Sequence, residues 1–344
     1  MKNKILVALS GGVDSSAAAA LLLEEGNTVG GATMRLCPDG CEDPSHDARA
    51  AAEKLGIPFF LFDLRKEFYD NVISDFIDTY KKGKTPNPCI VCNKTMKFGA
   101  FIDKAESLGY DKIATGHYGR IEKQGDRYLL FAGEYKEKDQ SYMLWSLSQK
   151  ALSHLVLPLG SLTKEDVRSI AAKIGLENAN KKESQDICFV PDGDYASFIM
   201  RETGLSFPEG DFVLEDGTVK GRHKGIIHYT VGQRRGLGLA LPAPLYVKRK
   251  DAEKNRVILC PADGLFSDSL SAHSVNWIPF DTLEGPITLE AKIRYGAKKT
   301  LCTVTPTGED TVSVAFNEPQ RAVSPGQSVV FYDGDMVVGG GIIE

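Results

Sequence analysis

Long hydrophobic runs are missing from this chain of 344 residues. No segment reaches the roughly 20 consecutive apolar residues that a membrane-spanning helix needs. The polar start Met1–Lys4 leads directly into an apolar strand pattern, without the hydrophobic segment of a signal peptide. Internal repeats and low-complexity segments are missing as well. The sequence therefore favours a globular protein of the cytoplasm with no membrane partner.

Cysteine is too scarce for a disulfide framework. Disulfide-stabilised domains are usually small and secreted and pair their cysteines, whereas this long chain has seven, an odd number. We therefore expect catalytic or metal-binding thiols. The cysteines are Cys37, Cys41, Cys89, Cys92, Cys188, Cys260 and Cys302.

Acidic residues are missing from one stretch of a chain that is acidic overall. The formal net charge of −5 does not by itself suggest a nucleic-acid partner. Residues 217–250, however, hold eight Lys and Arg and no Asp or Glu. A local basic surface of this kind attracts phosphate backbones, although such runs are usually a solvated face.

The N-terminal segment carries the pattern of a phosphate-binding loop. Ile5–Leu9 is apolar like a buried strand of a parallel sheet, and Ala17–Leu23 is typical of the helix that follows. Between them, Gly11 and Gly12 let backbone amides approach an anion at a helix N-terminus, whose dipole favours negative charge. The lysine of the G-x-x-x-x-G-K-S/T motif is absent, which excludes an ordinary P-loop kinase or GTPase.

Residues Ser10–Ser16 resemble instead the PP-loop, S-G-G-x-D-S, of ATP pyrophosphatases. These enzymes cleave ATP to AMP and pyrophosphate while they adenylate a substrate. An ordinary glycine turn with a serine N-cap is the plain alternative, but the strand, turn and helix signals agree with one another.

The rest of the chain reads as three domains. Up to about residue 195, short apolar runs at 28–34, 59–62 and 112–115 alternate with helical stretches at 47–55 and 68–81, as in an α/β fold with a parallel sheet. After Pro191 come turns and short segments, with a hairpin expected at Asp211–Val219 around Asp216 and Gly217. From about Ser271, strand patterns recur at intervals of about 8 to 12 residues, typical of a small β-barrel or sandwich.

The sequence therefore predicts an α/β fold with these domain bounds. Residues 1–200 form a PP-loop ATP pyrophosphatase (adenine nucleotide alpha hydrolase-like) parallel-sheet domain that binds ATP and holds the catalytic residues. Residues 201–268 form a small, mainly β central domain. Residues 269–344 form a C-terminal β-barrel domain.

A C-x-x-C pair follows a proline-stiffened loop. Cys89 and Cys92 stand just before an expected helix start at Lys97, and a helix start lowers a thiol pKa. Lys94 and Lys97 would reinforce this effect if they lie close to the thiols. A single C-x-x-C is also half a zinc site, half an iron-sulfur site or a dithiol redox pair.

A third cysteine lies about a hundred residues further on. Cys188 sits in an apolar, strand-like segment, where the plain interpretation is a small core residue. The presence of an ATP-activating motif together with separated cysteines in charged segments favours sulfur chemistry.

Seven segments in register together resemble the tRNA-specific 2-thiouridylases, the MnmA/TrmU family, over almost the whole chain. They are Ser10–Ser16, Thr85–Pro88 with Cys92–Lys94, Ala114–Tyr118, Lys138–Tyr142, Asp186–Phe189, His228–Arg234, and Pro325–Ser328 with Gly339–Ile343. The resemblance implies ATP-dependent 2-thiolation of the wobble uridine (U34) of tRNA. Adenylation of the C2 oxygen makes AMP the leaving group, and sulfur then replaces that oxygen.

The resemblance also assigns roles to the cysteines. Cys188 carries a persulfide, and Cys92 is the nucleophile that releases the sulfur, which leaves a Cys92–Cys188 disulfide to be reduced. It implies three kinds of partner: a persulfide-delivering sulfur carrier or cysteine desulfurase, the tRNAs for Lys, Glu and Gln, and ATP with Mg²⁺. Asp14 is expected to help position Mg²⁺ or the phosphates. Alternatively, its carboxylate only interacts with the dipole at the helix N-terminus.

The remaining site residues are also carried over from the family pattern. ATP-binding residues are Ala8, Leu9, Ser10, Gly11, Gly12, Val13, Asp14, Ser15, Met34 and Gly116. tRNA-binding residues are Asn87, Pro88, Cys89, His117, Lys138, Asp139, Gln140, Arg294, Tyr295 and Gln327. Met34 alone would be read as core and His117 as a structural histidine. The central domain would bind tRNA, its basic stretch Lys220–Lys250 gripping phosphates through Arg234 and Arg235.

Two cysteine features depart from the family pattern. Many members have Asp at the position of Cys89, so Cys89, Cys92 and Cys188 make a three-thiolate set that could hold a [4Fe-4S] cluster with one iron open to sulfide. In that alternative, Cys92 and Cys188 would be iron ligands. Cys37 and Cys41 lie outside the family core. They would form either a metal site in a loop or a pair of exposed thiols without a function.

Two other classes of function compete with thiolation. A PP-loop ligase or amidotransferase would use an amine against the adenylate and would need no cysteines. A non-catalytic RNA-binding protein that kept the fold would have no reason to keep both glycines and Asp14.

Overall fold

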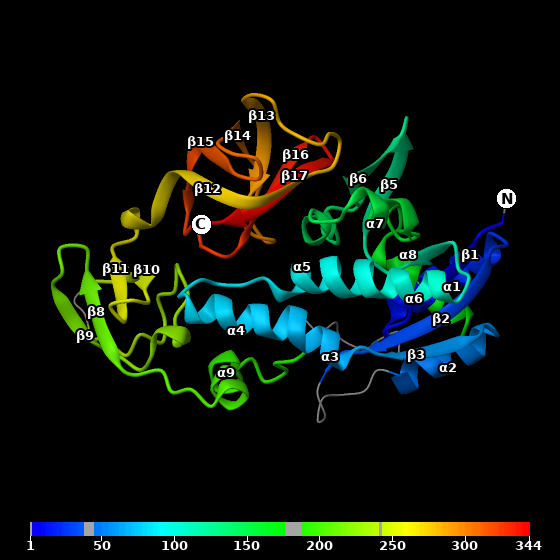
Figure 1. Cartoon of the computed structure of the whole chain (residues 1–344), viewed down its shortest axis with the longest axis horizontal. Coiled ribbons are helices and arrows are strands. Elements are labelled where there is room, and N and C mark those ends of the chain that lie inside the picture. The colour runs from blue at the N-terminus through cyan, green and yellow to red at the C-terminus, as the bar shows by residue number, and fades with distance from the viewer. Residues whose placement is uncertain (1, 38–44, 176–186, 241–242) are drawn as a thin grey trace.

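The computed structural model describes residues 2–37, 45–175, 187–240 and 243–344. The parallel sheet of the N-terminal region and the small sheet of the central region lie at opposite ends of the molecule, with the C-terminal strands between them (Figure 1). Within these described ranges, no helix is long and apolar enough to cross a membrane.

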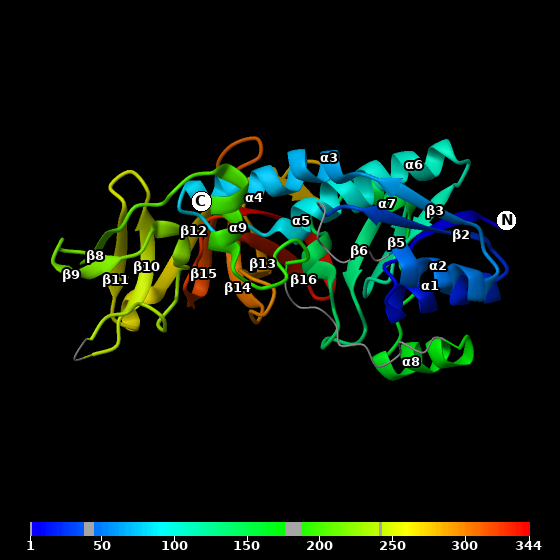
Figure 2. The same ribbon diagram turned by 90° about the horizontal axis from the view of Figure 1, so that it is seen from below.

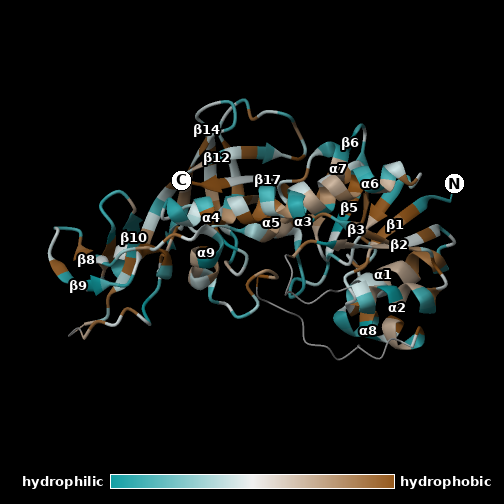
Figure 3. Cartoon of the chain, turned by 60° about the horizontal axis from the view of Figure 1, so that its bottom comes forward, coloured by the Kyte–Doolittle hydropathy of each residue, from teal (hydrophilic) through white to brown (hydrophobic). Residues whose placement is uncertain are grey.

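The N-terminal sheet is parallel and has the order β3-β2-β1-β4-β7. Its strands are β1 (Lys4–Ala8), β2 (Thr28–Arg35), β3 (Phe59–Asp63), β4 (Lys112–Ala114) and β7 (Leu155–Val156). Strand β1 is central because Ile5 pairs with Val29 on one side and with Lys112 on the other. Hydrophobic residues gather in this sheet (Figure 3), and α1 (Val13–Glu24) and α2 (Ser45–Leu55) accompany it. The predicted α/β class is confirmed.

Two long helical segments cross the middle of the molecule. One runs through α3 (Arg65–Phe68), a π-helical stretch at Tyr69–Ile73 and α4 (Ser74–Lys81). The other runs through α5 (Pro88–Cys92), a π-helical stretch at Asn93–Ala100 and α6 (Phe101–Ser107). The expectation of a helix start at Lys97 is wrong, since the helix already begins at Pro88, whose fixed φ suits a first helical position.

The central region is a small sheet of order β10-β11-β8-β9. Its elements are α9 (Tyr195–Thr203), β8 (Gly210–Leu214), β9 (Val219–His223), β10 (Tyr246–Asp251) and β11 (Arg256–Cys260). The β8–β9 hairpin lies where the sequence predicts it, with Gly217 at a φ of 88° in the turn. Phe212 of β8 shares a core with Phe76 of α4 and Phe198 of α9, so this region packs directly on the first domain.

The C-terminal strands close into a barrel. Their order is β12-β15-β14-β13-β16-β17, and β12 also pairs with β17. The strands are β12 (Phe266–Trp277), β13 (Ile287–Lys292), β14 (Thr300–Pro306), β15 (Val312–Arg321), β16 (Ser328–Asp333) and β17 (Met336–Ile343). The glycines of β17 make room for tryptophan, because a Cβ on Gly340 would come 2.7 Å from Trp145 and one on Gly339 2.8 Å from Trp277.

A hairpin from the first domain extends the barrel sheet. Strand β5 (Gly119–Gln124) pairs with β6 (Arg127–Ala132), and Leu130 of β6 pairs with Val337 of β17. Among the described residues, short 3₁₀ helices lie at Ser141–Leu144, Ile226–His228 and Asp263–Leu265. The first and last domains are thus joined by main-chain hydrogen bonds as well as by side chains.

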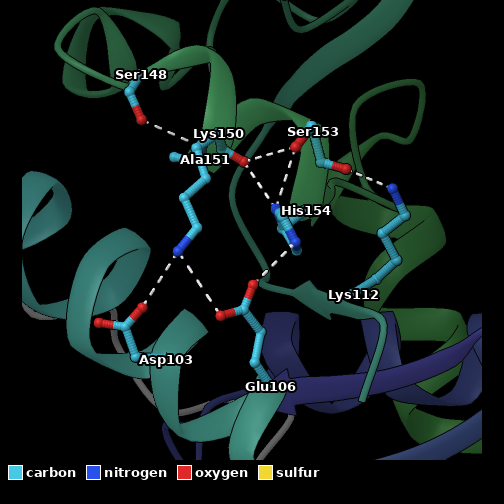
Figure 4. A network of polar contacts seen from close by, with 8 residues as sticks. All are labelled: Asp103, Glu106, Lys112, Ser148, Lys150, Ala151, Ser153 and His154. Atoms are coloured by element: carbon cyan, nitrogen blue, oxygen red, sulfur yellow. Dashed lines mark hydrogen bonds and ion pairs between the residues drawn. The ribbon is translucent and has the colours of Figure 1, made fainter. Parts of the chain in front are cut away.

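The first domain also contains helices α7 and α8. In α7 (Gln149–His154), Lys150 reaches Asp103 at 3.4 Å and Glu106 at 3.7 Å, and His154 reaches Glu106 at 3.2 Å, which fastens α7 to α6 (Figure 4). Helix α8 (Lys164–Lys173) lies beside α1 (Figure 2) and begins with a capping box between Thr163 and Asp166.

Candidate active site

The predicted phosphate loop lies at the carboxyl end of the central strand β1. Gly11 has a φ of 72°, and Gly12 is the N-cap of α1, so the helix start carries no capping side chain. Ser15 folds back onto the loop, where its Oγ accepts from the Ser10 amide at 3.1 Å and donates to the Gly12 carbonyl at 3.2 Å. Backbone amides at the start of α1 are therefore open to bind an anion without competition from a capping side chain.

The turn containing Gly116 packs directly against this loop. A Cβ on Gly116 would lie 2.7 Å from the Ser15 nitrogen and 2.8 Å from the Asp14 carbonyl carbon. Only glycine allows so close an approach of two backbones. The structure thus brings the predicted ATP residues Asp14, Ser15 and Gly116 together, while Met34 is half-buried near the end of β2.

Two residues that the sequence analysis missed hold Asp14. The ammonium group of Lys164 lies 2.7 Å and 2.9 Å from the two carboxylate oxygens of Asp14, and the hydroxyl of Tyr118 donates to one of them at 3.0 Å. Tyr118 belongs to the A-T-G-H-Y segment, but nothing in the sequence spacing indicates that Lys164 would reach this loop. A positive charge therefore stands beside the loop whose motif lacks a lysine.

The ion pair between Lys164 and Asp14 affects the expectation that Asp14 helps to position Mg²⁺. Both carboxylate oxygens of Asp14 are already engaged by Lys164. Across the described ranges, no group of three His, Cys, Asp or Glu side chains is placed to hold a metal ion. Within these ranges the side chains thus form no metal cage, and Asp14 is held beside the loop by Lys164.

The predicted thiols gather around Lys97. Cys89, Cys92 and Cys188 all lie within the electrostatic influence of its ammonium group, and Cys188 also interacts with both other thiols. Cys92 is 8% exposed, whereas Cys89 and Cys188 are exposed. The structure thus brings the three candidate thiols into one neighbourhood.

The expected activation of the C-x-x-C pair is wrong. Burial raises the pKa of Cys92 to about 11 and also raises that of Cys89, although the Lys97 charge opposes the shift in both. Desolvation of a thiolate outweighs both the helix start and the nearby lysine. These two thiols are therefore mainly protonated at neutral pH.

Cys188 is the activated thiol instead. Its pKa is lowered to about 7, first by a hydrogen bond from the Cys37 side chain and then by Lys97 and by backbone amides. The strand-like environment expected for Cys188 is also wrong, because the residue lies in a turn closed by the Val190 amide on the Ile187 carbonyl at 2.8 Å. An exposed thiol that is about half ionised at neutral pH suits sulfur transfer.

The three-thiolate alternative finds no support in the geometry. Cys89, Cys92 and Cys188 do not make up a metal-binding group in the part of the chain that the structure describes. The residues therefore do not fit a [4Fe-4S] cluster as they stand. Cys41 lies outside the described residues.

The C-terminal barrel clamps the loop that precedes the C-x-x-C pair. The Thr85 amide donates to the Pro325 carbonyl at 2.8 Å, and the side-chain amide of Gln327 donates to the carbonyls of Thr85 at 3.1 Å and Pro86 at 3.0 Å. The predicted tRNA residue Gln327 therefore holds the backbone just before Asn87, the N-cap of α5, which begins with Pro88 and Cys89.

A second group of predicted tRNA residues surrounds Tyr118. Gln140 exchanges two hydrogen bonds with the Tyr118 backbone, at 2.8 Å and 3.0 Å. The hydroxyl of Tyr295 in the barrel donates to the Asp139 carbonyl at 3.0 Å, and Tyr295 remains 41% exposed. Lys138 lies on the same loop, while Arg294 is exposed and donates to the Arg321 carbonyl at 3.1 Å.

His117 links the two halves of the site. Its Nδ1 lies 2.8 Å from the Thr115 hydroxyl, and its ring packs near Phe98. Burial, with a smaller contribution from Lys97, holds the pKa of His117 well below its usual range, so the ring is neutral at neutral pH. His117 therefore serves here as a neutral hydrogen-bonding group beside the lysine of the thiol site.

The basic stretch Lys220–Lys250 is not one continuous free face. Arg222 pairs with Asp211 at 3.1 Å, and Lys248 pairs with Glu215 at 2.7 Å. The ammonium group of Lys250 lies 5.5 Å above the Tyr80 ring, and burial lowers its pKa to about 8. Arg234 and Arg235, the residues singled out for phosphate contact, are both exposed.

Family models match the chain in three consecutive parts. The tRNA methyl transferase HUP domain matches residues 3–192, the tRNA methyl transferase PRC-barrel domain matches 196–261, and the aminomethyltransferase beta-barrel domain matches 267–343. Together with the anion loop at the end of β1, these matches define a HUP-domain protein of the PP-loop class with two β domains attached.

Curated relatives align over the full length. The tRNA-specific 2-thiouridylase MnmA of Acetivibrio thermocellus is 49% identical over 100% of this chain and 99% of its own. The enzyme of the same name from Clostridium acetobutylicum is 47% identical over 100% of both chains. The chain therefore belongs to the tRNA-specific 2-thiouridylase MnmA family.

A solved structure with partial overlap is titled as a 4-thiouridine synthetase in complex with RNA and bound ATP. It aligns with a TM-score of 0.37 and 18% identity over 59% of this chain and 50% of its own. A similarity at this level says nothing about function.

Proposed function

We propose that this chain catalyses the ATP-dependent 2-thiolation of uridine in tRNA, at the wobble position U34. The C2 oxygen of the base attacks the α-phosphate of ATP, and pyrophosphate leaves. A sulfur nucleophile then attacks C2, and AMP departs with the former C2 oxygen. The products are 2-thiouridine, AMP and pyrophosphate.

One structural relationship carries this proposal. The turn Thr115–Tyr118 contacts the PP-loop through Gly116 against Ser15. Its His117 lies within the electrostatic influence of Lys97, the same lysine that acts on Cys89, Cys92 and Cys188. The proposed adenylating loop and the thiol site therefore lie near the same short turn. A reaction that needs both adenylation and sulfur transfer uses such an arrangement, whereas a ligase that uses an amine does not.

The chain's own residues have distinct parts in this scheme. Backbone amides around Gly11 and Gly12 bind the phosphates, and Lys164 supplies positive charge beside them. Mg²⁺ would accompany ATP and neutralise its phosphates when bound. Cys188 carries the sulfur as a persulfide delivered by a carrier protein or cysteine desulfurase, and the family pattern gives the release step to Cys92.

RNA would lie across the face where the barrel meets the first domain. Asn87, Pro88 and Cys89 would contact the target base, with His117 beside it. Lys138, Asp139, Gln140, Arg294, Tyr295 and Gln327 would contact the surrounding RNA, and Arg234 and Arg235 would reach phosphates further away. A single base splayed out of a loop suits such a pocket. The family pattern suggests the tRNAs for Lys, Glu and Gln.

The test is nucleoside mass spectrometry on unmodified transcript tRNA. The protein, purified without oxygen, is incubated with ATP, Mg²⁺ and a small persulfide, with and without a reconstituted iron-sulfur cluster. Formation of 2-thiouridine, AMP and pyrophosphate by the cluster-free protein supports the proposal. Thiolation that requires the cluster would replace the persulfide route by the cluster route.

Two variants separate thiolation from the competing functions. Cys188→Ser should abolish 2-thiouridine while ATP is still cleaved in the presence of tRNA, whereas a ligase would keep its full activity. Cys302→Ser is the matched control, because Cys302 is buried in the barrel and a serine there can still donate to the Leu289 carbonyl. Tight tRNA binding without ATP turnover would instead indicate a binding protein.

A further inference from the structure

A groove of about 570 Å³ lies between the edge strands of two sheets in the first domain. Strand β7 is the last strand of the parallel sheet, and β5 is the last strand of the sheet that extends the barrel. Residues of β4, β5, β6 and β7 line the groove, together with the segment that leads to Ser161. Strand β6 of the hairpin stands beside α7 (Figure 1).

The groove is more positive than negative. Among its described lining residues, Lys112, Arg120 and Lys123 are cations and Glu122 is an anion. Glu122 lies 3.6 Å from Arg120 and offsets part of its charge. Within the described ranges, neither Lys112 nor Lys123 forms an ion pair with a carboxylate. The charge of these two lysines is therefore available to an anion.

An aromatic ring lies beside both lysines. The ammonium groups of Lys112 and Lys123 lie 5.8 Å and 5.6 Å from the centre of the Tyr128 ring. Lys112 is half-buried and also donates to the Ser153 carbonyl (Figure 4). Cations next to an aromatic face are the combination that binds a nucleic-acid strand, because the cations attract phosphates and the ring stacks on a base.

Protection of a sheet edge does not explain the whole arrangement. Charged residues on an edge strand prevent it from pairing with another chain, which accounts for Glu122 and Lys123 on β5. Lys112, however, belongs to the inner strand β4, and Tyr128 belongs to β6. Side chains from three strands thus converge on the groove, which indicates a ligand with negative charge.

One end of the groove adjoins the candidate active site. A Cβ on Gly160 would come 2.2 Å from the Gly119 carbonyl oxygen, and the Glu134 amide donates to the Gly160 carbonyl at 2.9 Å. Gly119 directly follows Tyr118, the last residue of the turn beside the PP-loop. Glu134 belongs to the loop that carries the predicted tRNA residues 138–140. The groove therefore begins next to residues expected to contact the target region of the RNA.

We propose that this groove binds the phosphate backbone of the substrate RNA next to the target uridine. The inference rests on the proposed function, in which the target base lies beside His117. Lys112 and Lys123 contact the phosphates, and the Tyr128 ring stacks on a base. This contact is separate from the basic stretch of the central domain, which lies at the opposite end of the molecule (Figure 1).

The salt dependence of tRNA binding tests the proposal on the full-length protein. The Kd for unmodified transcript tRNA is measured by filter binding without ATP at several KCl concentrations. Lys123→Gln should raise Kd about 5- to 20-fold at low salt. It should also lower the slope of log Kd against log salt concentration by about one, the effect of one lost phosphate contact. Because Lys123 is exposed, the variant should fold.

Lys104→Gln is the matched control. Lys104 is exposed on α6 outside the groove, and its replacement removes the same charge. We expect wild-type Kd and slope from this variant. Equal weakening by both variants would assign the effect to net charge and overturn the proposal. Wild-type Kd and slope in Lys123→Gln would also overturn it.

Two further outcomes separate the groove from other assignments. If Lys123→Gln binds tRNA normally but loses thiolation only when a carrier protein delivers the sulfur, and not with a small persulfide, the groove binds a protein and the RNA assignment is wrong. Groove-dependent tRNA binding by a protein that makes no 2-thiouridine would support the groove and count against the proposed reaction. Thiolation with unchanged kcat/KM and Kd for tRNA in Lys123→Gln would support the reaction and overturn the groove.

Discussion

The ammonium group of Lys164 lies 2.7 Å and 2.9 Å from the two carboxylate oxygens of Asp14, although 150 residues separate them. Both side chains are mostly enclosed, with exposed fractions of 17% for Lys164 and 26% for Asp14. The pair stands at the start of α1, where the phosphates of a nucleotide would bind. A cation there can exchange its carboxylate partner for a phosphate oxygen, as the lysine of an ordinary P-loop does.

Lys164→Ala should therefore impair adenylation. Charge-assisted hydrogen bonds are worth about 1.5–3 kcal/mol, so we expect the rate of pyrophosphate formation per ATP bound to fall roughly 10- to 100-fold. The measurement is pyrophosphate release with saturating tRNA over a series of ATP concentrations. Lys173→Ala, at the exposed end of the same helix, is the control and should leave the rate unchanged. Wild-type kinetics from Lys164→Ala would mean that the ion pair is structural.

Gly116→Ala should damage the nucleotide site without touching a catalytic side chain. The added Cβ would lie 2.7 Å from the Ser15 nitrogen, and relief of such a clash requires backbone movement that typically costs about 1–3 kcal/mol. We expect a lower melting temperature and weaker ATP binding, measured by thermal denaturation with and without ATP. Gly285→Ala, which meets open space, is the control. Unchanged ATP binding in Gly116→Ala would show that the turn does not hold the loop.

Alkylation rates should report the ionisation of the thiols. Cys188 has a pKa of about 7, so its reaction with iodoacetamide should rise between pH 6 and 8 with a midpoint near 7, because the thiolate is the reactive form. Cys92, with a pKa of about 11, should react slowly throughout this range. Peptide mass spectrometry over time separates the two.

The same experiment isolates the effect of Cys37. Removal of its hydrogen bond, the largest cause of the lowered pKa of Cys188, should move the alkylation midpoint of Cys188 upward in Cys37→Ala. Cys37→Ser keeps a donor and should show a smaller shift. A midpoint that stays near 7 in Cys37→Ala would assign the activation of Cys188 to Lys97 and the backbone amides.

Local patterns in the sequence predicted the elements that carry the nucleotide site. The first strand, the glycine turn and the following helix depend on neighbouring residues and form close to the predicted positions. The strand ends at Ala8 instead of Leu9, and the helix already begins at Val13 instead of Ala17. Contacts between distant segments could not be predicted in this way. The capping box at Thr163 is visible in the sequence, but the pairing of Lys164 with Asp14 depends on how α8 docks beside α1.

The properties of the thiols depend on the same kind of distant contact. Helix position alone suggested reactive thiols at Cys89 and Cys92, but burial in a core built from several segments reverses the expected pKa shift. Two strands of the barrel also depend on contacts with distant segments. Strand β12 is rich in serine, and three glycines interrupt the β-branched residues of β17 where two tryptophans pack, so both strands depart from the usual strand composition.

Gln327→Ala tests whether the barrel positions the loop that would face the target base. The variant loses hydrogen bonds of 3.1 Å and 3.0 Å to the Thr85 and Pro86 carbonyls, each worth about 0.5–1.5 kcal/mol, so the loop ahead of Asn87 should become less ordered. We expect kcat/KM for tRNA in thiolation to fall roughly 5- to 50-fold. The persulfide loading of Cys188 without tRNA should stay at the wild-type rate.

The control is Gln320→Ala, which also loses side-chain hydrogen bonds in the barrel, to Thr300 at 3.2 Å and to the Glu318 carbonyl at 2.8 Å, but does not touch the loop. Both variants weaken the barrel. A difference between their kcat/KM values therefore measures the effect of the Gln327 contact with the loop and not that of general stability. If both lose the same fraction of kcat/KM, the barrel acts through the stability of the fold. If Gln327→Ala alone loses it, the loop before Cys89 must be held by the C-terminal domain for the base to reach the thiols.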